Sequence, residues 1–172
     1  MAHIIKNGDI VRDDWTLLRL AEGETPETVA LPAGKVFFPL PVWQARKAEI
    51  LAGGRETNGI GLLLEPADRV EDAADDLAHF AAIAVNFPKF VDGRGFSTAS
   101  LLRQRYGYPG ELRAVGDVVH DTLFFMKRVG FDAFALKEGK SPEYAVEKGF
   151  SVFSERYQAS TDQPVPYFRR RS

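Results

Sequence analysis

The sequence predicts a single α/β domain built around a mostly parallel sheet. From residue 35 onward, short apolar segments alternate with helix-compatible ones, which is the pattern of βα units. The segment 81–87 is apolar except for Asn86, as expected for a central strand that is buried on both faces. A chain of 172 residues is long enough for one such domain with its own core. We therefore treat residues 1–172 as one domain.

The first part of the chain precedes the repeated units. Asn7-Gly8 stands between short apolar runs, and a tight hairpin turn requires positive φ at both of its central residues. We therefore expect a β-hairpin within residues 1–20. Residues 21–34 are polar and rich in turn-forming types, which indicates a connector or a weakly ordered loop.

About five βα units are expected over residues 35–157, followed by an extended tail over 158–172. The predicted strands and the helices that follow them are 35–40 and 41–54, 60–65 and 67–80, 81–87 and 97–107, 111–117 and 118–130, and 131–137 and 141–157. Gly130 is expected to end a helix in the left-handed region. Ser141, which precedes a proline, is expected to cap the last helix.

Two closures of the sheet fit this series of units. An open, doubly wound sheet of the flavodoxin or Rossmann type, with three layers, fits the length well and is the arrangement that we expect. A partial barrel of the TIM type is the alternative, because a full barrel needs about 250 residues. Arg113 and Asp117 share one face of a predicted strand, which suits the polar interior of a partial barrel or a paired site over an open sheet.

Composition limits the chemistry. The chain has no cysteine, which excludes a thiolate nucleophile, a CxxC redox pair and a cysteine-ligated iron–sulfur cluster within it. His3, His79 and His120 have no zinc-like spacing, so we expect no metal site. A formal charge of −2 gives no general attraction to nucleic acid. No apolar run approaches the ~20 residues that span a bilayer, and the N-terminus lacks a signal-peptide pattern, so a cytoplasmic location is expected.

The candidate site lies at the carboxyl edge of the predicted sheet, where parallel α/β folds bind ligands. In the loop KFVDGRGFS, two glycines let the backbone approach a ligand, a serine is expected to cap the next helix, and two cations add positive charge. We interpret this loop as an oxyanion or phosphate site. The residues predicted to bind the anion are Lys89, Gly93, Arg94, Gly95, Ser97 and Arg113. In the alternative interpretation, the glycines only form a tight turn and Arg94 pairs with Asp92.

A second cluster joins Asp117 to Asp121 at the start of the following helix. Two carboxylates at this spacing can bind a hard cation or share a proton. They are also favourable next to a helix N-terminus without any catalytic role, and Arg113 is then the expected partner of Asp117. Asp117 and Lys89 are the candidate catalytic residues.

Five segments within residues 87–136 together resemble a bacterial family of unknown function whose genes lie beside assimilatory sulfite reductase; they are FPKF, DGRGFS, LLRQRYGY, GELRAVGDV and GFDAFAL. Its members are labelled as oxidoreductases involved in sulfite reduction. The resemblance implies a role in sulfate assimilation, with sulfite reductase or its electron donor as partner. It supplies no catalytic residue.

Three functions therefore remain open. The first is an accessory protein that assists sulfite reductase or its electron delivery. The second is a small enzyme that binds a sulfate- or phosphate-bearing metabolite of the same pathway. The third is an oxidoreductase with flavin or nicotinamide, although the chain has neither a Rossmann GxGxxG nor a Walker pattern and no cofactor is recognisable. The sequence also leaves open whether the hairpin extends the sheet or forms a homodimer, and what the Arg-rich end does.

Overall fold

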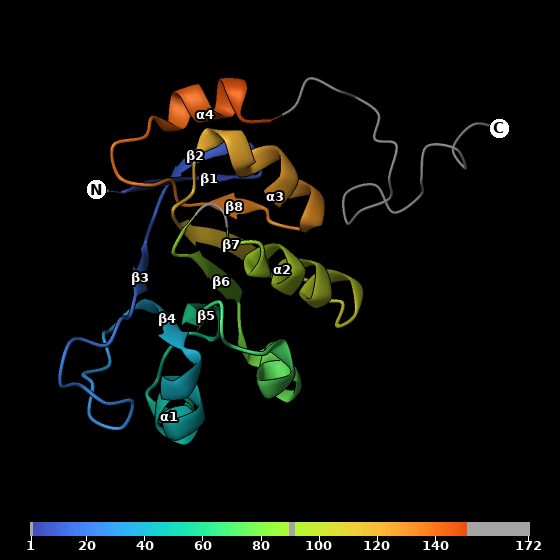
Figure 1. Ribbon diagram of the computed structural model, residues 1–172. Helices are drawn as coiled ribbons and strands as arrows, with labels where there is room; N and C mark the ends of the chain where they lie inside the picture. Colours follow the sequence, from blue (N-terminus) through green and yellow to red (C-terminus); the bar gives the residue numbers. More distant parts are fainter. Residues whose placement is uncertain (1, 90–91, 151–172) are drawn as a thin grey trace.

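The computed structural model describes residues 2–89 and 92–150, which form an α/β unit around one eight-stranded sheet (Figure 1). The order of its strands is β2-β1-β8-β7-β6-β5-β4-β3. The strands from β3 to β8 run parallel to one another, whereas β1 lies antiparallel between β8 and β2. The strands are β1 (His3–Lys6), β2 (Asp9–Arg12), β3 (Trp15–Leu17), β4 (Lys35–Pro39), β5 (Ile60–Leu64), β6 (Ala82–Phe87), β7 (Glu111–Gly116) and β8 (Ala133–Phe134).

The helices follow the strands in sequence and cover the outer face of a curled sheet (Figure 1). They are α1 (Leu40–Ala52), η1 (Thr57–Gly59), η2 (Val70–His79), α2 (Arg94–Gln104), η3 (His120–Thr122), α3 (Leu123–Val129) and α4 (Pro142–Lys148), where η marks a 3-10 helix. None of these helices is long and apolar enough to cross a membrane.

The prediction of a mostly parallel α/β sheet is confirmed, but the doubly wound arrangement is wrong. A doubly wound sheet needs a point where the strand order reverses, so that helices cover both faces. Here the order is consecutive from β3 to β8, and the sheet curls into a half-barrel. The alternative prediction of a partial barrel therefore describes the fold.

The two faces of the sheet carry separate apolar clusters. On the outer face, Phe38, Leu62 and Ile83 pack beneath the helices in the main core. On the inner face, a smaller cluster contains Phe37 with Ala82 and Ala84 and other apolar residues. Small inner residues let the strands curl, because the interior of a barrel leaves little room for side chains.

The N-terminal hairpin is confirmed, but it is shorter than predicted. Asn7 and Gly8 have φ of 51° and 87°, and they join β1 to β2 in the expected tight turn. Residues 13–20 do not belong to the hairpin, since β3 pairs in parallel with β4 at the opposite edge of the sheet. The hairpin itself extends the sheet through β1 and β8, with Ile5 opposite Phe134.

Only two residues, Asp13 and Asp14, connect the two edges of the sheet, because β2 is one edge strand and β3 is the other. The chain must therefore cross the hollow side of the half-barrel, as Figure 1 shows for the segment that leads from β2 to β4. We call residues 13–17 the strap. Trp15 in the strap stacks on Phe37 of β4, with ring centroids 4.5 Å apart.

The connector over residues 21–34 forms no strand or helix of its own, but it is anchored to the body. Val29 is buried, and its carbonyl accepts a hydrogen bond from the guanidinium of Arg46 in α1. Arg46 also forms an ion pair with Glu49 one turn later.

The later elements match the sequence in kind and differ in their bounds. Ser141 caps α4 as predicted by accepting a hydrogen bond from the backbone N–H of Tyr144, and Gly130 ends α3 with φ 122°. The predicted helix continues to residue 157 and the predicted tail begins at 158, and both segments beyond residue 150 lie outside the described residues. Ser97 is not a helix cap, because α2 already begins at Arg94.

Candidate functional site

The carboxyl edge of the half-barrel carries polar side chains at the ends of consecutive strands. Glu65 follows β5, Asn86 lies near the end of β6, Asp117 follows β7, and Lys137 lies beyond β8. In βα barrels this edge carries the binding and catalytic groups, whereas the opposite edge serves stability. The carboxyl edge is therefore the candidate site, as the sequence predicts.

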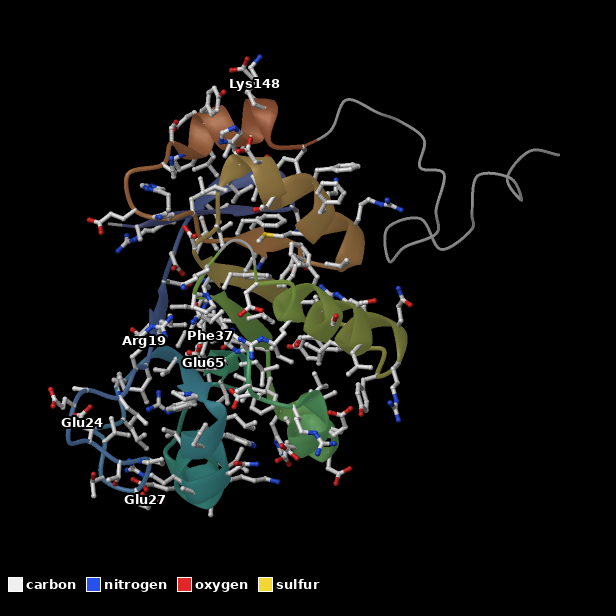
Figure 2. The ribbon with its side chains drawn as sticks, viewed as in Figure 1. Arg19, Glu24, Glu27, Phe37, Glu65 and Lys148 are labelled. Atoms are coloured by element: carbon white, nitrogen blue, oxygen red, sulfur yellow. The ribbon has the colours of Figure 1, made fainter. Side chains whose placement is uncertain are left out.

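Glu65 is the centre of the first group of contacts. Its Oε2 accepts a hydrogen bond of 2.7 Å from Nδ2 of Asn86, and its Oε1 accepts one of 3.1 Å from Nη1 of Arg19. Asn86 is only 7% exposed, so Glu65 satisfies a buried amide. Figure 2 labels Arg19 and Glu65 beside the strands. Arg19 was not predicted as a site residue, because it lies in the stretch that the sequence assigns to the hairpin.

The second group is the ion pair of Asp117 and Lys137, whose Oδ1 and Nζ atoms are 3.0 Å apart. Gly116 brings this group close to the first. It has φ 96°, and a Cβ at this position would lie 2.5 Å from Oδ1 of Asn86 and against the carbonyl of Phe87. The next backbone N–H, that of Asp117, donates to the same carbonyl at 2.6 Å. Glycine is thus required where β7 leaves the sheet next to β6.

The glycine loop reaches the same edge, but its cation is already paired. Lys89 is exposed after β6, and Gly93 is the N-cap residue of α2. Arg94 forms two hydrogen bonds with the carboxylate of Asp92, of 3.0 and 2.7 Å, as in the alternative interpretation of the loop. Asp92 also accepts the backbone N–H of Arg94, which explains why the helix begins here rather than at Ser97.

Gly95 contributes packing to this loop. It is buried, and a Cβ there would lie 2.5 Å from the ring of Phe87. Ser97 is exposed inside α2. The structure therefore places Lys89, Gly93 and Arg94 at the surface of the edge, while the anion-binding role of these residues stays a prediction.

Arg113 lies inside the half-barrel rather than with the glycine loop. Its side chain is 3% exposed, and its partners are Glu111, through Nε at 2.7 Å, and Asp13 of the strap, through Nη1 at 2.8 Å. It also lies over the ring of Phe37 at 5.0 Å. Arg113 is not the partner of Asp117, which pairs with Lys137 instead.

The second predicted carboxylate, Asp121, lies in η3 and is largely exposed. Its Oδ1 is 2.8 Å from Nε2 of His120. Within residues 2–89 and 92–150, no three His, Asp or Glu side chains are placed to hold a metal ion.

Two grooves open on the inner side of the half-barrel. The first, of about 210 Å³, lies between the strap and strands β7 and β8, with Arg113 and Trp15 in its walls. The second, of about 290 Å³, lies at the carboxyl ends of β3, β4 and β5, and Arg19, Glu65 and Asp68 contribute its polar groups.

Two carboxylates at this edge have pKa values shifted in opposite directions. Burial raises the pKa of Asp68, and the nearby charge of Glu65 adds to the rise although the carboxylate accepts the Glu65 backbone N–H. The hydrogen bonds from Arg94 lower the pKa of Asp92.

The fold and the edge define the class of this protein as an α/β half-barrel with a polar carboxyl edge. A family model described as a bacterial protein of unknown function (DUF934) matches residues 61–168. The chain belongs to this family. No curated protein matches the sequence.

Proposed function

We propose that this protein is an accessory protein of assimilatory sulfite reduction, which assists sulfite reductase or its electron delivery in the cytoplasm. The proposal rests on the resemblance of residues 87–136 to the family described above, and this stretch falls within the segment that the family model matches. The chain has no cysteine, so electron transfer through its own thiols is excluded.

The accessory role is supported by the ion pairs that the charged side chains form with one another at the carboxyl edge. Arg94 pairs with Asp92, Lys137 with Asp117, and Arg19 with Glu65. A general base or nucleophile needs a lone pair directed at the substrate, and these ion pairs direct the charges at one another. A binding role requires no such group.

The test is the turnover of sulfite reductase with its physiological electron donor, with and without the protein, together with a co-elution experiment. Stimulation with co-elution supports the proposal. No change in turnover and no complex at concentrations of both proteins of about 50 μM contradicts it, because a functional transient complex is expected to be populated there.

Where a complex forms, two matched variants locate its surface. Phe125 in α3 is 58% exposed, and Leu51 in α1 is 41% exposed on another part of the molecule. Exposed aromatic side chains are enriched at protein interfaces. Phe125→Ser is therefore expected to weaken the complex, while Leu51→Ser leaves it unchanged.

The second candidate function is a small enzyme that binds a sulfate- or phosphate-bearing metabolite at the glycine loop. It is favoured by the position of Lys89 and of Arg94, whose side chain is 63% exposed, at the carboxyl edge of the parallel strands. An anion would compete with Asp92 for the guanidinium of Arg94.

Titration with inorganic sulfate and phosphate, followed by amide chemical shifts, tests this candidate. Binding that is lost in Arg94→Gln and in Lys89→Gln supports it. Lys148→Gln is the control, since Lys148 lies on α4, away from the labelled edge residues (Figure 2). Equal binding by all of these variants contradicts a specific anion site.

A further inference from the structure

The groove between the strap and strands β7 and β8 has the walls of a small-molecule site. Its apolar walls come from Trp15 and Leu17 of β3, Phe37 of β4, Val115 of β7 and Ala135 after β8. The Trp15 and Phe37 rings are stacked with an interplanar angle of 27°. Aromatic walls of this kind favour a flat or apolar ligand body.

A buried cation lines the same groove. The guanidinium of Arg113 has five N–H groups. Within the described residues, the group on Nε and one on Nη2 face Oε1 of Glu111, and one on Nη1 faces Oδ1 of Asp13. In this part of the chain, one N–H on Nη1 and one on Nη2 have no acceptor, so they can bind a ligand. Only an acceptor can bind them, and a charged acceptor binds most strongly.

The other charges around the groove do not oppose an anion. The charges of Asp13 and Glu111 are balanced by Arg113 and Lys6 together, since Glu111 also lies 2.8 Å from Nζ of Lys6. At the mouth, Lys137 and Glu138 line the groove with opposite charges. The Lys137 side chain is more than half exposed, so it can turn from Asp117 toward a ligand.

We propose that this groove binds a small aromatic carboxylate, with its ring against Trp15 and Phe37 and its carboxylate between Arg113 and Lys137. The site lies inside the half-barrel, apart from the glycine loop. This proposal does not depend on the proposed role in sulfite reduction. The volume of about 210 Å³ suits a ligand with a single ring rather than a dinucleotide.

The two tryptophans of the chain provide a readout with an internal control. Trp15 lines the groove, whereas Trp43 is fully buried under the helices and donates its indole N–H to Asp76. In a two-dimensional ¹⁵N–¹H spectrum of the full chain, each indole N–H gives its own signal, and Trp15→Phe assigns them. Benzoate is expected to shift the Trp15 signal in a saturable manner and to leave the Trp43 signal in place.

Matched probes and variants test the charge and the position. Benzamide is neutral and benzamidine is cationic at the same size, so we expect benzoate to bind at least tenfold more tightly than benzamidine, with benzamide between them. Ala135→Leu fills the groove without changing a charge and is expected to abolish the shift. Lys137→Gln is expected to weaken benzoate binding several-fold, whereas Lys140→Gln, an exposed lysine of the same loop outside the groove walls, leaves it unchanged.

Three outcomes would overturn the proposal. The first is the absence of any Trp15 shift up to about 10 mM benzoate, which corresponds to a binding free energy weaker than roughly −3 kcal/mol. The second is equal binding of benzoate and benzamidine. The third is undiminished binding of benzoate by Ala135→Leu. None of the variants needed for these comparisons removes Arg113, and an unchanged Trp43 signal shows that each variant is folded.

Discussion

The half-barrel holds two sets of ion pairs that use the same kinds of side chain in opposite surroundings. Inside the barrel, Glu111, Arg113 and Asp13 form one connected cluster, in which Arg113 is 3% exposed and the Glu111 side chain 8% exposed; Lys6, which is 42% exposed, joins it through Glu111. At the carboxyl edge, the Arg94 side chain that pairs with Asp92 is 63% exposed. The comparison indicates that burial, and not the residue type, determines how much an ion pair contributes to the stability of the fold.

The comparison is tested most strongly at Arg113. Arg113→Met leaves Glu111 and Asp13 without their buried counter-ion, and such a loss costs about 3–5 kcal/mol. Arg94→Met breaks an exposed pair and is expected to cost far less stability than Arg113→Met. Urea unfolding measures both free energies of unfolding. If the two substitutions cost the same, burial does not distinguish the two sets.

A triple variant sharpens this result. Combining Arg113→Met with Glu111→Gln and Asp13→Asn removes the stranded charges, so part of the lost stability is expected to return. If the triple variant is no more stable than Arg113→Met, the cost comes from lost packing around Phe37 rather than from unpaired charge.

The next effect in size concerns the backbone between the two sets of charges. Gly116→Ala places a Cβ against Asn86 and Phe87 at a positive φ, whereas Gly139→Ala has a similar φ of 81° in open space. We expect Gly139→Ala to cost about 1 kcal/mol and Gly116→Ala to cost about 2–3 kcal/mol, because only the latter adds a steric clash. Thermal unfolding of the two variants checks the difference, and equal costs would contradict the close approach of β6 and β7.

A smaller effect is expected at Glu65. Glu65→Gln removes the charge that Arg19 and Asn86 share and turns an N–H donor toward one of these two donors. Since Glu65 is partly exposed, the expected cost is about 1 kcal/mol. Glu147→Gln, which affects only an exposed pair with Lys148, serves as the control and is expected to cost nothing measurable in urea unfolding.

The smallest effect is a pH dependence that has opposite signs at Asp68 and Asp92. The pKa of Asp68 is raised by burial, so its contribution to stability is present below its ordinary value of 3.8 and is lost as the pH rises through the raised pKa. The pKa of Asp92 is lowered by Arg94, so its contribution is present above 3.8 and is lost as the pH falls through the lowered pKa.

Asparagine variants make this difference measurable. At pH 7, Asp68→Asn is expected to raise the Tm slightly and Asp92→Asn to lower it. The Asp68→Asn difference shrinks as the pH falls from the raised pKa of Asp68 to 3.8, whereas the Asp92→Asn difference shrinks as the pH falls below 3.8. Side-chain carbonyl NMR titration gives the two pKa values directly. An Asp68 that titrates below Asp92 would contradict the assignment.

Much of the fold could be predicted from the sequence, because local signals determine it. Continuous apolar runs identify β4, β5 and β6, and Asn7-Gly8 identifies the hairpin. The closure of the sheet could not be predicted in the same way, since open sheets and barrels use the same βα units. One signal for closure was present. Gly61, Ala82 and Ala84 place small side chains on one face of β5 and β6, as the narrow interior of a barrel requires.

The site was predictable where it depends on strand ends and not where it depends on distant contacts. Glu65, Asn86, Asp117 and Lys137 are found from the ends of predicted strands, because parallel strands bring their carboxyl ends to one edge. Arg19 was missed, since it follows β3, which is an edge strand that the sequence does not assign to the parallel sheet. The pairing of Arg113 with Asp13 could not be predicted either, because Asp13 is 100 positions away in the chain.

The pairing of Ile5 with Phe134 determines the order in which the chain can be assembled during translation. A ribosome that adds ~5–20 residues per second exposes the N-terminal hairpin on the order of ten seconds before its neighbouring strand exists. During that interval Ile4 and Ile5, both buried in the finished protein, have no cover from β8. The first strands to be synthesised are thus among the last to find their place, so nascent chains that stop before residue 133 are the species that we expect a chaperone to meet.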